Sequence, residues 1–146
     1  MTNNLPGPSA SPDAGPYWDA AAAERLQVQQ CSDCGSHRFP PSHLCRDCGS
    51  DNTAWVTVSG KGCIYSFSIV HRAPTPAFRA HVPYVVALID LEEGPRMMAN
   101  IIGDGCLDCA IAERVEVCFE DRGEGAKIPQ FRLVGSGGGK LGDVAQ

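Results

Sequence analysis

The chain has 146 residues, of which 43% are hydrophobic, and its 12 lysines and arginines against 17 aspartates and glutamates give a formal net charge of −5. This length has room for one ordinary domain with a small appendage. The acidic balance argues against a general nucleic-acid-binding protein, which gains most of its affinity by neutralising phosphates, and no apolar run is long enough to span a bilayer. Eight cysteines and an opening MTNNLPGPSA that lacks a secretion signal predict a cytoplasmic protein in a reducing compartment.

The first residues differ in character from those that follow. Residues 1–15 are rich in proline, glycine, serine and asparagine, so we expect a disordered tail. Good helix formers then follow a proline, and we expect a helix over 16–26 within a unit, 16–30, that also holds a lead-in strand. So short a helix is marginal alone, and Trp18 is its obvious anchor. Either Trp18 plugs the chain's own core or, together with Tyr17, it forms a partner interface.

The stretch over 31–50 holds two C-x-x-C-G pairs separated by ten residues, a spacing typical of a rubredoxin-like zinc ribbon. Four thiolates close a tetrahedral site and leave no open position for substrate, so the predicted Zn²⁺ is structural rather than catalytic. Disulfides or a redox pair are the alternatives. His37 and His43 could substitute as ligands, although we expect both at the surface. The predicted metal ligands are Cys31, Cys34, Cys45 and Cys48.

After the second cysteine pair the sequence indicates successive short strands separated by turns. Five or six antiparallel strands in about eighty residues suit a small closed barrel better than a sandwich. We therefore predict an all-β chain, with an OB-fold barrel over 52–134 preceded by the ribbon and the short helix. A glycine-rich composition predicts a flexible tail over 135–146. The expected strands are 54–58, 63–71, 84–91, 96–102, 115–119 and 130–134, and 84–91 is apolar on both faces.

The sequence contains no recognisable catalytic motif. Metalloprotease, nucleophile-elbow, P-loop and dinucleotide-binding patterns are all missing, so we assign no catalytic residue. A nucleophilic pair of Cys63 with His71 stays open, although Cys63 is more simply a small core residue. Cys106 and Cys109 form a further C-x-x-C without obvious partners, which is a weak metal or redox signal and otherwise an ordinary loop.

The most unusual polar segment is 71–83, where two arginines and two histidines gather in a chain that is acidic overall. Arginine forms paired charge-assisted hydrogen bonds with phosphate, and the three prolines lower the entropy cost of holding a bound shape. The segment is a candidate anion-binding loop, with a solvated loop of incidental charge as the alternative. Arg96, Asn100 and Arg132 on nearby strands could extend its positive surface. The candidate ligand residues are His71, Arg72, Pro74, Phe78, Arg79 and Arg96.

Several of these segments together resemble a known family. They are the Tyr-Trp helix, the four-cysteine ribbon with Phe39-Pro40-Pro41, and the barrel segments Ser59-Gly60-Lys61-Gly62, 64–74, 83–88 and 115–121. From 16 to 134 the chain resembles the zinc-ribbon plus OB-fold proteins associated with acyl-CoA enzymes. The match is specific in the ribbon and in His71-Arg72-Ala73-Pro74, and it is loose over 106–113.

The resemblance implies a non-catalytic accessory subunit rather than an independent enzyme. Members of that family accompany thiolase-like enzymes, including aldolases and acyltransferases, or hot-dog-fold hydratases in hetero-oligomers, where they bridge subunits or hold the CoA part of an acyl-CoA substrate. For this chain the resemblance implies phosphate contacts from His71, Arg72 or Arg79. Phe78 would then pack on the adenine or pantetheine arm, and the helix aromatics would dock on the partner.

Two other functions stay open. OB barrels and ribbons also bind single-stranded nucleic acid through a basic groove with stacked aromatic side chains, although the three lysines and the charge of −5 disfavour this function. A pure scaffold that binds no small molecule differs from the accessory subunit only in whether loop 71–83 holds CoA.

Overall fold

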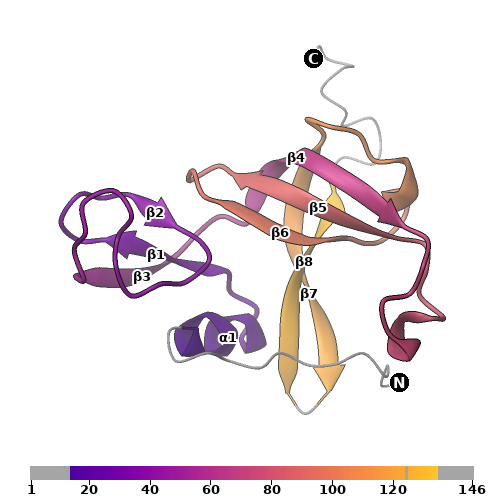
Figure 1. Ribbon diagram of the computed structural model, residues 1–146, viewed down its shortest axis with the longest axis horizontal. Helices are drawn as coiled ribbons and strands as arrows, with labels where there is room; N and C mark the ends of the chain where they lie inside the picture. The colour runs from indigo at the N-terminus through magenta and orange to yellow at the C-terminus, as the bar shows by residue number, and fades with distance from the viewer. Residues whose placement is uncertain (1–13, 124, 135–146) are drawn as a thin grey trace.

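A computed structural model describes residues 14–123 and 125–134 (Figure 1). The tails predicted over 1–15 and 135–146 lie outside the described residues, apart from Ala14 and Gly15. The described chain holds a short helix, a three-stranded sheet and a closed five-stranded barrel, and the helix lies between the sheet and the long β7–β8 hairpin (Figure 1). Within this part of the chain, no helix combines the length and the apolar character needed to cross a membrane.

Helix α1 (Gly15–Ala22) ends about one turn earlier than the sequence predicts. Backbone hydrogen bonds close its last turn, from Glu24 N–H to Ala21 O at 2.9 Å and from Arg25 N–H to Ala20 O at 2.8 Å. This pair of bonds is a Schellman motif, which needs a left-handed backbone at the residue after the cap. Glu24 takes that backbone, with a φ of 62°. Glycine usually fills this position, so the sequence carries no stop signal there.

The ribbon sheet holds three antiparallel strands in the order β2-β1-β3, namely β1 (Gln27–Cys31), β2 (His37–Arg38) and β3 (Thr53–Thr57). The strand expected over 54–58 therefore exists, but it belongs to the ribbon sheet rather than to the barrel. Its register with β1 places Val56 opposite Val28. The sequence of a strand predicts its extended backbone but does not specify its pairing partner.

The remaining five strands close into a barrel in the order β4-β5-β6-β8-β7, as expected for an OB-like fold. The β5–β6 and β7–β8 connections are antiparallel hairpins, and one parallel pair, Ile101 with Phe131, joins β6 to β8. Two short 3₁₀ helices, η1 (Pro76–Phe78) and η2 (Cys106–Asp108), lie in the connections after β4 and β6. The strands are β4 (Lys61–Val70), β5 (Tyr84–Leu91), β6 (Arg96–Ile101), β7 (Arg114–Gly123) and β8 (Ala126–Leu133).

Alternation along β5 separates the barrel interior from its outer face. Val85, Ala87 and Ile89 are buried at 1% exposure or less, and the residues between them are half-buried. The expectation that this strand is covered on both sides is thus right for the inner face and only partly right for the outer one. Other large, fully buried side chains of the same core cluster include Phe131, Ile64, Ile101 and Val115.

One continuous hydrophobic core joins the helix, the ribbon and the barrel. Tyr17 of α1 and Leu26 before β1 belong to the same buried cluster as Met97 of β6. An ion pair between Glu24 and Lys127 of β8 also ties the end of α1 to the barrel. The ribbon is therefore held against the barrel, and the surfaces between them have a defined shape.

Candidate functional site

Two tight knuckles bring the predicted metal ligands together. In each knuckle the glycine after the second cysteine takes a left-handed backbone, with φ of 82° at Gly35 and 78° at Gly49. Their N–H groups donate to Cys31 O and Cys45 O, both at 2.9 Å. In the second knuckle, the backbone N–H of Asp47 also points at Cys45 Sγ, with 3.3 Å between the nitrogen and the sulfur.

The four cysteine sulfurs form one cluster and lie within 4.8 Å of one another. Cys31 Sγ is 3.5 Å from Cys48 Sγ, and Cys34 Sγ is 3.6 Å from Cys45 Sγ. Four sulfurs at about 2.3 Å from a tetrahedral zinc ion would be roughly 3.8 Å apart, so this donor set fits zinc. The two histidines between the cysteine pairs are not part of the cluster.

Hydrogen bonds favour the thiolate form at two of these cysteines. The hydrogen bond from the Ser36 hydroxyl contributes most to lowering the pKa of Cys45 to about 6, and backbone N–H groups contribute further. At Cys31, the backbone N–H of Cys34 contributes most to lowering the pKa. At Cys48 the backbone N–H of Ser50 acts to lower the pKa, but the thiol of Cys31 and desolvation outweigh it and raise the pKa to about 12. Full ionisation of the cluster therefore requires a cation to balance the charge.

Polar side chains around the knuckles hold them in place. The Asp33 carboxylate in the first knuckle accepts hydrogen bonds from the Ser50 hydroxyl and from Asn52 Nδ2, and these bonds lower the pKa of Asp33. Arg38 of β2 is buried at 8% exposure and donates from Nη2 to Thr53 Oγ1 at 2.7 Å. The ribbon is thus cross-linked independently of its sulfurs, which positions them for a metal ion.

The predicted anion-binding loop connects β4 to β5 and contains η1 (Pro76–Phe78). In the described part of the chain, Arg72 and Arg79 make no ion pair and no side-chain hydrogen bond. The sequence also has no aspartate or glutamate from 71 to 89. The loop therefore carries exposed positive charge, and no acidic residue lies within the segment itself. Its exposed polar or cyclic side chains are His71, Arg72, Pro74, Thr75, Pro76, Arg79, His81 and Pro83.

Phe78 and Arg96, the other two candidate ligand residues, have different surroundings. The Phe78 ring is half-buried and packs against Tyr84, with the ring centroids 5.7 Å apart. Arg96 begins β6, beyond the far end of β5, where it donates from Nε to Asp90 Oδ1 at 2.6 Å. Its guanidinium also lies 3.5 Å from the centre of the Tyr65 ring, and the hydrogen bond to Asp90 raises the pKa of Arg96. The structure therefore does not bring Arg96 to the loop.

The helix aromatics take two different positions. Tyr17 is 5% exposed, and its ring contacts Trp18 and Phe39 at centroid distances of 4.7 and 5.3 Å. Tyr17 therefore packs in the chain's own core, whereas the sequence predicted it at a partner interface. Trp18 is half-buried and lines an apolar groove of about 390 Å³ that Phe78 also lines. The groove brings together two aromatic residues that are far apart in the sequence.

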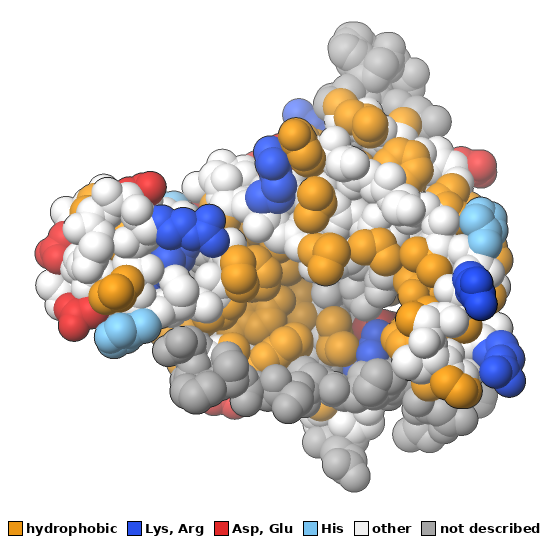
Figure 2. All heavy atoms as spheres, viewed as in Figure 1, with side chains coloured by type: hydrophobic (Ala, Val, Ile, Leu, Met, Phe, Trp, Pro, Cys, Tyr) orange, Lys and Arg blue, Asp and Glu red, His pale blue; other side chains and the backbone are white. Residues whose placement is uncertain are grey.

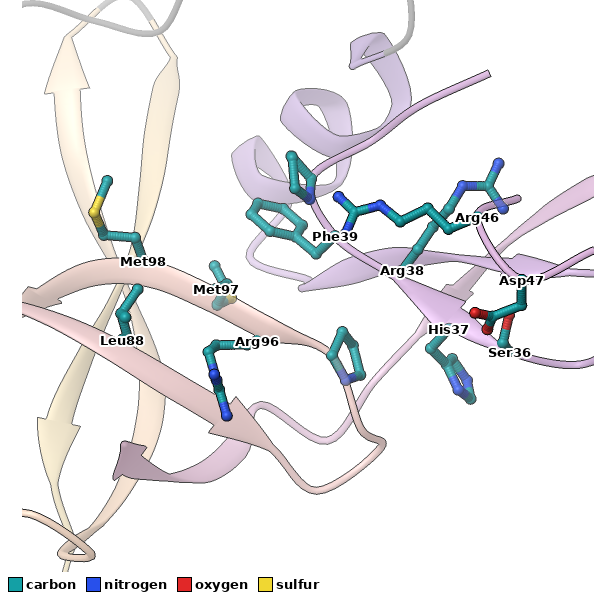
Figure 3. Close-up of a pocket in the computed structure, with 12 residues that line it drawn as sticks. Ser36, His37, Arg38, Phe39, Arg46, Asp47, Leu88, Arg96, Met97 and Met98 are labelled. Carbon is teal, nitrogen blue, oxygen red and sulfur yellow. The ribbon is translucent and has the colours of Figure 1, made fainter. Parts of the chain in front are cut away.

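A second depression, which sequence reasoning missed, separates the ribbon from the barrel and has a volume of about 710 Å³. We call it the ribbon–barrel cleft. Figure 3 shows Phe39 and Arg46 on its ribbon side and Arg96, Met97 and Met98 on its barrel side. No sequence motif marks these residues, because they come from two parts of the chain that meet only after folding.

The remaining cysteines do not form a nucleophilic site of the kind considered above. Cys63 lies near the start of β4 and His71 follows its end, so at about 3.3 Å per residue they are roughly 25 Å apart. Cys109 is buried, and burial, followed by Glu113 and Cys106, raises its pKa. A thiol with a raised pKa is a poor nucleophile.

Two family models match the chain in succession. The rubredoxin-like zinc ribbon domain of ChsH2 matches residues 18–54, and the C-terminal OB-fold domain of ChsH2 matches residues 55–120. These matches agree with the ribbon and barrel that the structure shows.

Individual proteins are similar over most of the same region. A probable enoyl-CoA hydratase alpha subunit of Thermomonospora curvata is 40% identical over 98 residues, which cover 67% of this chain and 30% of that protein. A DUF35 domain-containing scaffold protein of Methanothermobacter thermautotrophicus is 36% identical over 95 residues, which cover 64% of this chain and 71% of that protein. A solved structure described as the Ltp2-ChsH2(DUF35) aldolase superposes with a TM-score of 0.78 at 34% identity and covers 86% of this chain and 98% of that one. The chain spans only about a third of the length of two hydratase alpha subunits that it matches, 30% of one and 36% of the other.

Proposed function

The chain belongs to the DUF35 family, in which a ChsH2-type zinc ribbon precedes an OB-fold barrel, and on that premise we propose that it is a non-catalytic accessory subunit of an acyl-CoA enzyme complex. Its partner in this hetero-oligomer is a thiolase-like enzyme or a hot-dog-fold hydratase, which carries the nucleophile and the general bases. This chain helps assemble the complex and holds the CoA part of the substrate. Relatives described as a hydratase subunit, a scaffold protein and an aldolase support this proposal.

The observation that carries the CoA-holding role is the free positive charge on loop 71–83. CoA bears several phosphates, and the exposed guanidinium groups of Arg72 and Arg79 have no competing acidic partner in the described chain. The apolar groove that Phe78 and Trp18 line is adjacent to the same loop. In our proposal the phosphates contact the loop, and the adenine or pantetheine arm packs on Phe78.

The ribbon has an architectural role in this proposal. Its four sulfurs hold a structural Zn²⁺, which supplies folding energy and takes no part in the chemistry. Without the ion, we expect the knuckles and the short strand β2 to lose their structure, because they bury little apolar surface of their own. The metal thereby keeps the ribbon wall of the ribbon–barrel cleft in place.

The experiment that tests the CoA-holding role is titration of acyl-CoA into the assembled complex. We expect Arg72→Ala to weaken binding by roughly 1–3 kcal/mol, because it removes a charge-assisted hydrogen bond. Arg25→Ala is the matched control, since it removes an exposed guanidinium after α1 that is outside the loop. Unchanged affinity in the Arg72 variant would exclude that residue from the site and favour a scaffold that holds no CoA.

A further inference from the structure

The ribbon–barrel cleft combines an apolar floor with arginines on both walls. Phe39 on the ribbon side and Leu88, Met97 and Met98 on the barrel side supply the apolar surface. Met98 is 66% exposed, the highest value among the exposed large hydrophobic residues of the described chain. Figure 2 shows orange side chains gathered in a hollow between the ribbon and the barrel, with blue side chains on two sides of it. Methionine and arginine are enriched at protein–protein interfaces.

The arginines of the cleft differ in how far they are already paired. Arg46 of the second knuckle is exposed and, within the described residues, makes no ion pair and no side-chain hydrogen bond. Arg96 is oriented by Asp90 and by the Tyr65 ring, so part of its hydrogen-bonding capacity is used. Arg38 also lines the cleft, but it is buried, donates to Ser42 and Thr53 and leaves only Nη1 without a partner. Arg46 is thus the exposed arginine of the cleft that is free to bind an anion.

The charge balance decides between a polyanion and a peptide. Asp47 lines the cleft, and Asp90 neutralises Arg96, so two carboxylates partly offset the charge of the three arginines that line it, Arg38, Arg46 and Arg96. Several clustered phosphates would be repelled by these acids, whereas a peptide that offers one or two carboxylates would not meet the same barrier. Loop 71–83, which has no acidic residue, is the better phosphate site.

From these observations we propose that the ribbon–barrel cleft is a docking groove for an acidic segment of the partner protein. A carboxylate of that segment pairs with Arg46, and an apolar side chain next to it packs on Met98 and Leu88. The inference rests on the proposed accessory role, because it assigns the surface by which this chain holds its partner. It leaves the cationic loop available for CoA, while Phe39 and Met98 line both the cleft and the aromatic groove, so the two depressions share a wall.

The test uses the full chain and a displayed library of random twelve-residue peptides as the probe. Peptides selected on the natural chain are then measured by fluorescence anisotropy against variants. Selected peptides should combine an acidic residue with a nearby apolar one. Arg46→Glu should weaken their binding at least about tenfold, because it removes one charged hydrogen bond. Met98→Ser should also weaken binding, because it removes exposed apolar contact without changing charge.

Matched controls separate the cleft from general surface effects. Arg25→Glu makes the same charge change outside the cleft, and Ile111→Ser truncates a hydrophobic residue of similar exposure, 64%, that does not line it. Both should leave peptide affinity unchanged. Circular dichroism and thermal melting verify that each variant is folded.

Several outcomes would overturn the proposal. These are selected peptides without acidic residues, equal affinity for Arg46→Glu, or a larger loss in Arg79→Glu, which would place the peptides on the loop. Conversion of a dimer to a monomer by Arg46→Glu would identify a second copy of this chain as the occupant.

If an acyl-CoA enzyme co-purifies equally well with Arg46→Glu and Met98→Ser, the docking site is wrong while the proposed function stands. If no enzyme co-purifies with the natural chain, the proposed function itself fails.

Discussion

The side-chain amides of Asn100 and Gln130 fasten the barrel where its backbone ladder is weakest. Strands β6 and β8 share only one residue pair, so few backbone hydrogen bonds join them. Gln130 Oε1 accepts the backbone N–H of Asn100 at 2.8 Å, and Gln130 Nε2 donates to Asn100 Oδ1 at 3.0 Å. Gln130 is 3% exposed. Two amides thus replace missing ladder bonds in a site from which water is largely excluded.

We predict that Gln130→Ala lowers the free energy of unfolding by about 1–3 kcal/mol, because it leaves a backbone N–H without its partner in a largely buried site. Urea denaturation measures the change. Gln27→Ala is the control, since Gln27 donates to Thr57 in an exposed hydrogen bond of the ribbon sheet and its loss should cost within about 0.5 kcal/mol. Equal effects of the two variants would contradict a closing role for Gln130.

The metal site predicts one zinc ion per chain and loss of that ion in Cys45→Ser. Structural zinc is worth roughly 10–16 kcal/mol in small domains, so the ribbon should unfold without it while the barrel stays folded. Elemental analysis gives the stoichiometry, and amide spectra of residues 27–57 report the fold. Cys118→Ser, in β7 and outside the sulfur cluster, should keep its zinc. A Cys45 variant with stoichiometric zinc and an intact ribbon would refute the assignment.

Gly62 lies where β4 closely approaches β5, and we predict that Gly62→Ala destabilises the barrel. A Cβ at this position would lie 2.4 Å from the Asp90 carbonyl oxygen, so a strand must shift at a cost of about 1–3 kcal/mol. Gly15→Ala provides the control, because nothing lies within 4 Å of an added Cβ there. Thermal melting compares the two variants, and a Gly62 variant as stable as the control would show that the approach is looser than described.

Stability above pH 10 should depend on Tyr17. Burial raises the pKa of Tyr17, so the folded state retains the phenol proton that the unfolded chain releases near its ordinary value. This contribution is fully present below about pH 10 and falls by about 1.4 kcal/mol for the next pH unit. Tyr17→Phe should therefore lose less stability between pH 9 and 11 than the natural chain. Tyr65→Phe, at a position that is 48% exposed, should not share this behaviour.

Features set by local sequence could be predicted. The cysteine spacing indicated the knuckles, because a C-x-x-C-G run specifies both the turn and the ligands, and the ribbon and OB-like barrel agree with that prediction. Alternating apolar residues located the barrel strands, although β7 and β8 extend further into their shared hairpin than the sequence suggested. The loop 71–83 stood out because charge composition needs no knowledge of the fold.

Features set by tertiary context could not be predicted. The end of α1 depends on Glu24 adopting a backbone usually reserved for glycine. The partner of β3 depends on a register with β1, which no local pattern specifies. The ribbon–barrel cleft joins Arg46 to Met98, and their proximity exists only once the ribbon packs on the barrel.

The accessory-subunit role is tested most directly by purifying the tagged chain from its own cells at physiological salt and identifying what remains bound by native mass spectrometry. A thiolase-like enzyme or a hot-dog-fold hydratase at fixed stoichiometry with this chain is the predicted result. Recovery of nucleic acid, or of the chain alone, would contradict it.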